Sequence, residues 1–144
     1  MSKRENNKLS PELERMYDKA YEAYLNSYSP YSKFKVGAAV LLKSGDIVIG
    51  TNVENSSYGL TSCAERNALF NTYSLGYRSF DIDKLMIIGN TDDPVSPCGA
   101  CRQVIMELMN ENSDVILTNL YKDIKIMKVR DLIPYAFKED LKNE

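Results

Sequence analysis

The most constraining feature of this chain is the order in which short strand-like segments alternate with helical ones. Segments rich in apolar and β-branched residues predict strands at 34–42, 47–53, 85–89, 115–118 and 124–129. Helical spacing of apolar residues predicts helices at 11–26, 62–73 and 97–110, with a short helical turn at 129–133. This order predicts an α/β fold with three α/β/α layers, in which a mixed five-stranded sheet carries helices on both faces.

The first helix has a clear start signal. Ser10 is suited to cap it, and Pro11 follows at the position where a missing N–H costs nothing. An apolar stripe then recurs at helical spacing, and despite its tyrosines it is most simply a face that packs on the core. Its members are Leu13, Met16, Tyr17, Ala20 and Tyr24.

Length and charge limit the domain count and the partners. We expect residues 1–144 to form a single domain, with flexible, solvated ends at 1–10 and 138–144. The net charge is -2, and the basic residues are scattered. That distribution argues against a nucleic-acid partner and favours a small neutral substrate. We see neither a membrane span nor a signal peptide, so we expect a cytoplasmic protein without a membrane partner.

Histidine and cysteine counts constrain the chemistry further. The chain has no histidine, so no imidazole can act as a base or a metal ligand. It has three cysteines, an odd number, and in a reducing compartment a disulfide framework is not expected. Cysteines in such a chain are ordinary core residues unless their spacing indicates otherwise.

Two of the cysteines have an informative spacing. Cys98 and Cys101 follow Pro97 and would share the first turn of the 97–110 helix, where the helix dipole favours thiolates. Such a pair is either half of a metal site or a redox dithiol. Cys63, at the start of another predicted helix, favours the metal site, because zinc prefers four ligands and three thiolates leave one position open. Without a fourth cysteine or a histidine, the open position argues for a catalytic centre.

Glu65 is the candidate proton carrier. It lies two positions after Cys63, a rotation of roughly 200° on a helix, so both side chains cannot bind one ion from the middle of a helix. Zinc lowers the pKa of a bound water to about 7, and a nearby carboxylate can move the proton to a substrate. A glutamate that merely stabilises a helix N-terminus is the simpler alternative, and both descriptions can hold together.

Several stretches together resemble the cytidine deaminase family, in its small homotetrameric type with three cysteines. Zinc deaminases hold the metal through three cysteines, or two and a histidine, and use a glutamate that is not a ligand. The stretches follow the family's order and span most of the chain between residues 30 and 137. They are PYSKFKVG at 30–37, NVENSSY at 52–58, CAER at 63–66, PCGACRQ at 97–103 and LTNL at 117–120.

The resemblance implies a function and a set of roles. It implies hydrolytic deamination of cytidine and deoxycytidine to uridine and deoxyuridine in pyrimidine salvage, with one Zn²⁺ per subunit. Glu65 would be catalytic, and either Arg66 or Arg102 could support the thiolates, whose charge exceeds that of zinc. The metal ligands would be Cys63, Cys98 and Cys101; the substrate would contact Phe34, Asn52, Glu54, Tyr58 and the backbone near Ala64 and Ser96; and Phe137 would enter a neighbouring subunit's pocket.

Assembly is expected on the same basis. Segments 58–60 and 133–137 carry aromatic and apolar residues outside any core stripe, as interface anchors do. We therefore expect a homotetramer whose active sites are shared, although both segments could simply cover their own core.

Three other functions compete with this one. A non-catalytic zinc module would need no nucleoside pocket, and an oxidoreductase that uses the Cys98–Cys101 dithiol would leave Cys63 and Glu65 unexplained. A deaminase of cytosine-nucleoside antibiotics, of the blasticidin type, shares the three cysteines but differs around the ribose-binding segment. Here the segment at 52–58 resembles the nucleoside type.

Overall fold

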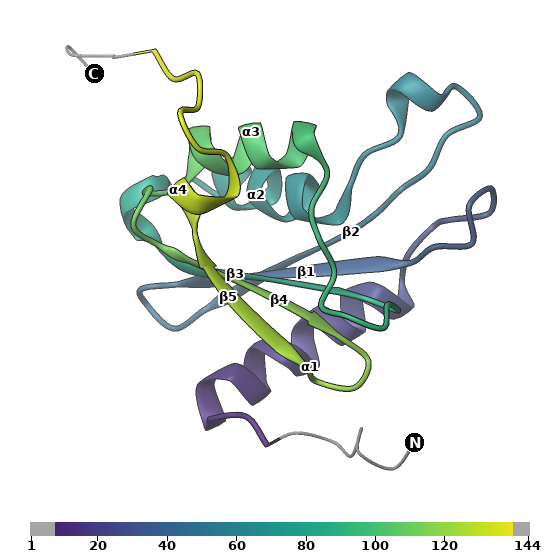
Figure 1. The fold of residues 1–144 in the computed structure, drawn as a ribbon, viewed down its shortest axis with the longest axis horizontal. Coiled ribbons are helices and arrows are strands. Elements are labelled where there is room, and N and C mark those ends of the chain that lie inside the picture. Colours follow the sequence, from purple (N-terminus) through teal and green to yellow (C-terminus); the bar gives the residue numbers. More distant parts are fainter. Residues whose placement is uncertain (1–7, 140–144) are drawn as a thin grey trace.

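Five strands form one sheet in the order β2-β1-β3-β4-β5 in the computed structural model, which describes residues 8–139 (Figure 1). The parallel pair β3 and β4 sits inside the sheet, and all other neighbouring strands are antiparallel. The predicted mixed five-stranded sheet is therefore confirmed. The strands are β1 (Val36–Leu42), β2 (Ile47–Thr51), β3 (Ile82–Gly89), β4 (Asp114–Asn119) and β5 (Ile124–Lys128).

Helices cover both faces of this sheet. Figure 1 shows α1 (Pro11–Leu25) on one face, and α2 (Ala64–Ser74), α3 (Gly99–Leu108) and α4 (Val129–Leu132) on the other. The three predicted layers are confirmed. Two short 3-10 helices, η2 (Tyr58–Leu60) and η3 (Ser79–Asp81), were not expected. No helix within residues 8–139 combines the length and apolar character needed to span a bilayer.

The side chains of the sheet alternate between two cores. Along β1, Val40 and its neighbours two residues away point to the layer of α2, α3 and α4, whereas Ala39 and Leu41 point to α1. In the α1 layer, Met16 and Ala20 are fully buried, which confirms that the stripe on this helix is a core face. Each face of the sheet thus has its own apolar packing.

The start of α1 also agrees with the sequence. The Ser10 hydroxyl accepts a hydrogen bond from the Leu13 amide at 3.3 Å, and Pro11 occupies the first turn. The Leu9 amide donates to the Glu14 carboxylate at 3.3 Å. Of the ends expected to be flexible, residues 1–7 and 140–144 lie outside the described part of the chain.

Three strand boundaries differ from the prediction by two or three residues. β1 begins at Val36 rather than at residue 34. β2 ends at Thr51 rather than at residue 53, because Val53 leaves β1 and forms isolated bridges with Tyr28 and Ser62. At Asn52 the side chain adds bonds to the backbone of Phe34 and Val36. β3 begins three residues earlier than predicted, at Ile82, which pairs with Leu42. The polar residues at 83–84 interrupt the apolar run, so the sequence pattern did not predict this first part of the strand.

One glycine sets the distance between α2 and the sheet. A Cβ atom on Gly50 would lie 2.2 Å from the Ala68 nitrogen and 2.6 Å from the Ala64 oxygen. The absence of a side chain at this position therefore lets the helix backbone lie directly on β2. This contact fixes the place of the first turn of α2, which carries part of the candidate site.

Candidate active site

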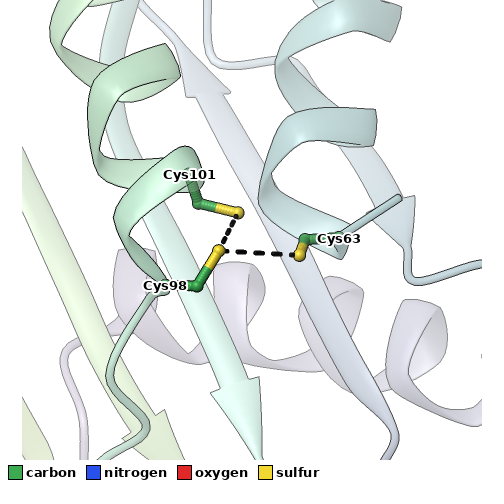
Figure 2. A group of neighbouring side chains, drawn as sticks. All are labelled: Cys63, Cys98 and Cys101. Carbon is green, nitrogen blue, oxygen red and sulfur yellow. Dashed lines mark hydrogen bonds between the residues drawn. The ribbon is translucent and has the colours of Figure 1, made fainter. Parts of the chain in front are cut away.

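The three cysteines converge where α2 and α3 begin (Figure 2). The Cys63 and Cys98 sulfurs are 3.9 Å apart, and the Cys98 and Cys101 sulfurs are 3.3 Å apart. All three sulfurs lie within 4.8 Å of one another. The structure thus brings Cys63 to the Cys98–Cys101 pair, as the sequence predicted.

The positions of these cysteines in their helices favour thiolates. Cys63 is the N-cap of α2 and Cys98 is the N-cap of α3, and neither side chain bonds to the helix backbone. Cys101 is fully buried in the first turn of α3. Unpaired amide groups and the positive end of each helix dipole therefore face the cluster, which stabilises negative charge on sulfur.

Arg66 is the arginine that reaches the cluster. Its Nη2 donates to the Cys63 sulfur at 3.3 Å. Within the cluster, the pKa of Cys63 is lowered, first by the hydrogen bond from the Cys101 thiol and then by Arg66. The pKa of Cys101 is raised, because its thiol donates to Cys63 and because it is buried. Arg102, the other candidate, bonds to oxygen atoms instead.

Glu65 occupies the second position of α2, beside the cluster. Only 4% of its surface is exposed, and burial raises the pKa of its carboxyl group. A carboxyl group in this environment holds a proton more readily than an exposed glutamate does. It is therefore suited to accept a proton and to return it.

A cavity of about 260 Å³ joins the cluster to the predicted substrate residues. The described residues that line it include two glutamates, Glu54 and Glu65, and no lysine or arginine. The cavity is thus suited to a neutral or cationic ligand rather than to a phosphate. Its walls are formed by Ser32, Phe34, Val36, Asn52, Glu54, Thr61, Ser62, Cys63, Glu65, Val95, Ser96 and Cys98.

Asn52 and Glu54 already hold the cavity wall in place. The Asn52 amide donates to the Phe34 carbonyl at 3.0 Å, and its oxygen accepts from the Val36 amide at 3.0 Å and from the Ser27 hydroxyl. Glu54 accepts from the Tyr31 and Ser32 amides at 3.0 and 3.1 Å. Both side chains are buried and order the segment at 31–36, which presents the half-exposed Phe34 ring.

Other predicted site residues lie outside this cavity. Tyr58 lines a neighbouring hollow of about 390 Å³ that shares Ser32, Glu54 and Thr61 with the cavity. Ala64 is fully buried and is not among the residues that line the cavity. Phe137 is 78% exposed, and its carbonyl accepts from the Gln103 side chain at 2.8 Å.

Sequence reasoning missed part of the cavity wall. Ser32 donates to the Glu54 carboxylate and lines the cavity, and its position inside the 30–37 stretch was a signal. Thr61, Ser62 and Val95 also line it. They follow no recognisable pattern, because they reach the cavity only through the way the chain folds.

Comparison with known proteins bears on the same residues. The family model described as the cytidine and deoxycytidylate deaminase zinc-binding region matches residues 10–117. The chain belongs to the cytidine and deoxycytidylate deaminase family. A cytidine deaminase from Sporosarcina psychrophila is 50% identical over 131 residues, which covers 90% of this chain and 95% of that protein. One from Halalkalibacterium halodurans is 48% identical over 125 residues, covering 87% and 93%.

Solved structures of the deaminase family have the same fold. The cytidine deaminase from Burkholderia pseudomallei, solved at 1.6 Å, has a TM-score of 0.85 and 43% identity, and the match covers 90% of this chain and all of that one. The cytidine deaminase from Mycobacterium tuberculosis has a TM-score of 0.75 and 34% identity, covering 90% and 100%.

The cysteine cluster fits the zinc ion that the deaminase family implies. Three thiolate sulfurs bound tetrahedrally at about 2.3 Å from one ion would be about 3.8 Å apart. Two of the separations, 3.3 and 3.9 Å, are close to that value, and the third sulfur pair lies within 4.8 Å. Three soft donors without a fourth protein ligand suit a zinc centre with one open position.

Proposed function

We propose that the protein hydrolytically deaminates cytidine and deoxycytidine, giving uridine and deoxyuridine and releasing ammonia. One observation carries the proposal. A single cavity joins two cysteines of the cluster and a buried glutamate to the segment ordered by Asn52 and Glu54. The relatives named cytidine deaminase, identical at 48–50% of matched positions, support the same activity. An antibiotic deaminase and a non-catalytic zinc module are less favoured by these comparisons.

In this proposal Cys63, Cys98 and Cys101 hold one Zn²⁺ per subunit. When bound, the ion would act as a Lewis acid and make water a strong nucleophile near neutral pH. The Arg66 guanidinium donates to Cys63 and offsets part of the negative charge of the three thiolates. The positive ends of α2 and α3 offset more of it.

Glu65 moves the protons. Its carboxylate accepts a proton as water adds to C4 of the cytosine ring, and it delivers that proton to N3. It then carries a second proton from the new hydroxyl group to the 4-amino nitrogen. The bond between C4 and the 4-amino nitrogen then breaks, and that nitrogen leaves as ammonia. A carboxyl group whose pKa is raised by burial is suited to hold a proton between these steps.

Substrate recognition falls to the other residues around the cavity. The half-exposed Phe34 ring is placed to contact the base. Asn52 and Glu54 would bind the ribose hydroxyls, using the hydrogen-bonding capacity that the backbone leaves free. The backbone near Ala64 and Ser96 would bind the amide edge of the base. The lack of cationic side chains among the described lining residues favours free nucleosides, as in pyrimidine salvage, over nucleotides.

We also propose that the protein assembles as a homotetramer with shared active sites. Tyr58, which lines the hollow beside the cavity, is 81% exposed, and Phe137 near the C-terminus is 78% exposed; large apolar side chains exposed in this way are typical of surfaces that a partner covers. A neighbouring copy would cover both, and Phe137 would enter the neighbour's pocket. Since three free thiols must stay reduced to bind zinc, we place the protein in the cytosol.

Incubation of the zinc-loaded protein with cytidine tests the activity. We expect loss of cytosine absorbance and one ammonia per uridine formed. Blasticidin S and cytidine 5′-monophosphate serve as comparison substrates and should react far more slowly. Faster release of ammonia from either would overturn the nucleoside assignment, and no release from any of the three by zinc-loaded protein would indicate a non-catalytic module.

A further inference from the structure

The Arg102 side chain is held at three points around the start of α3. Its Nε donates to the Pro97 carbonyl at 2.9 Å, and its Nη2 donates to the Ser96 hydroxyl at 2.7 Å. Its Nη1 donates to the Leu132 carbonyl at 2.6 Å. One guanidinium thus joins the loop before α3 to the last residue of α4.

One of these bonds bears directly on Cys98. The Pro97 carbonyl belongs to the peptide group that contains the Cys98 nitrogen, so a bond to this oxygen fixes the peptide plane that leads into the cysteine. Cys98 is exposed, and its side chain makes no capping bond, whereas Cys101 is held by complete burial. The exposed cysteine of the cluster therefore depends on its backbone for its position.

The third bond extends the connection to the C-terminal segment. Leu132 is the last residue of α4, where main-chain carbonyls lack helical partners, and Arg102 satisfies one of them. The next residue of α3, Gln103, donates to the Phe137 carbonyl at 2.8 Å. Between these two anchors, Ile133 and Ala136 pack against the core. Consecutive side chains of α3 thus hold both ends of segment 132–137.

We infer that Arg102 is a positioning residue that holds Cys98 in place for zinc and ties this position to the C-terminal segment. The inference rests on the proposed zinc centre and is independent of the nucleoside. Arginine suits this role because its rigid planar fork can address three oxygen atoms at once. A lysine offers a single charged point and cannot reproduce the three bonds.

The rate at which zinc passes to an excess of a chromogenic chelator tests the inference without any substrate. Loss of a group that orients a metal ligand typically costs 10–100-fold in metal affinity, so we expect Arg102→Gln to release zinc about 10-fold faster or more. Arg102→Lys should fall between this variant and the parent. If the glutamine variant does not fold, the rate of zinc release from Arg102→Lys tests the inference in its place.

Two control variants separate positioning from general stability. Gln103→Ala removes the bond to Phe137 only, and Tyr73→Phe removes a hydrogen bond of 2.8 Å to Leu108 at the far end of α3. Both should lower the melting temperature yet release zinc close to the parent rate. Zinc release at the parent rate by the Arg102 variants would overturn the inference. It would also be overturned if their release is faster only in proportion to their loss of melting temperature, with Tyr73→Phe giving that proportion. A parent protein that binds no zinc would instead overturn the centre itself.

Discussion

The Arg66 guanidinium lies one helical turn along α2 from Cys63 and donates to its sulfur at 3.3 Å. A cation is thereby placed beside a cluster whose thiolates together exceed the charge of a zinc ion. The start of α2 thus carries a thiol, a carboxyl group and a positive charge within four consecutive residues.

Replacement of Arg66 tests this contact. Arg66→Gln removes the charge and the donor to Cys63, so we expect kcat or zinc affinity to fall by about 10- to 100-fold. Arg66→Lys should recover part of the loss, because it keeps the charge but not the fork. Zinc content and kcat measured on the same samples separate the two effects. A glutamine variant that equals the parent in both would show that Arg66 is only a surface group.

Glu65→Gln should stop turnover without removing zinc. Glutamine is nearly the same size but cannot carry protons, so kcat should fall by at least about 100-fold. Metal analysis should still give one zinc per chain, because Glu65 is assigned to proton transfer and not to the metal. Loss of zinc together with activity would mean that this carboxylate is a ligand.

Glu54 should make stability depend on pH in the acid range. The Ser32 hydroxyl, together with the Ser32 and Tyr31 amides, holds the pKa of Glu54 below its ordinary value of 4.5. A group whose pKa is lower in the folded state contributes stability that is present above the ordinary pKa and is lost as pH falls through the folded value. We therefore expect Glu54→Gln to flatten the fall in melting temperature between about pH 6 and about pH 3. Glu22→Gln, at an exposed position of α1, is the control and should leave the slope unchanged.

Gly50→Ala should push α2 away from the sheet. The added methyl group would lie 2.2 Å from a backbone atom of the helix, so the backbone itself has to move. Overpacking of this kind typically costs about 1–3 kcal/mol, which urea unfolding would measure. Gly59→Ala adds the same methyl group in open space and should be nearly neutral. Equal stability of the two variants would contradict the close approach.

Assembly has a direct test in light scattering during size exclusion. We expect about four times the mass of one chain, and an active monomer at assay concentration would exclude the proposed tetramer. Mixing inactive Glu65→Gln chains with chains that end at Pro134 then tests the shared pocket. The former supply Phe137 and the latter supply Glu65, so activity should return on mixing. Absence of recovery in proven mixed tetramers would show that each chain completes its own site.

The sequence was sufficient for the layers of the fold and for the kind of site, because both follow from local patterns. Periodicity located every main helix and strand, and the start of α1 followed from Ser10 and Pro11. The positions of Cys98 and Cys101 at the start of α3 followed from their spacing, although Cys98 caps the helix, which begins at Gly99 rather than at residue 97. These features depend on residues that are neighbours in the chain.

Features that depend on distant residues were not predictable in the same way. Just after the end of β2, the Asn52 side chain bonds to the backbone of residues 34 and 36, which are far away in sequence. The choice between Arg66 and Arg102 likewise needed coordinates, since both follow a cysteine of the cluster closely. In each case a side chain selects its partner from atoms that only the folded chain brings together.

The two separate cores on either side of the sheet bear on how the mature protein is made. Neither core cluster includes a cysteine, and 144 residues are enough to fold without a staple. Cys98 is exposed, so an ion can reach the cluster from solvent after folding. Metal can then be loaded after folding, and we expect a chelator to strip the ion reversibly while the polypeptide keeps its fold.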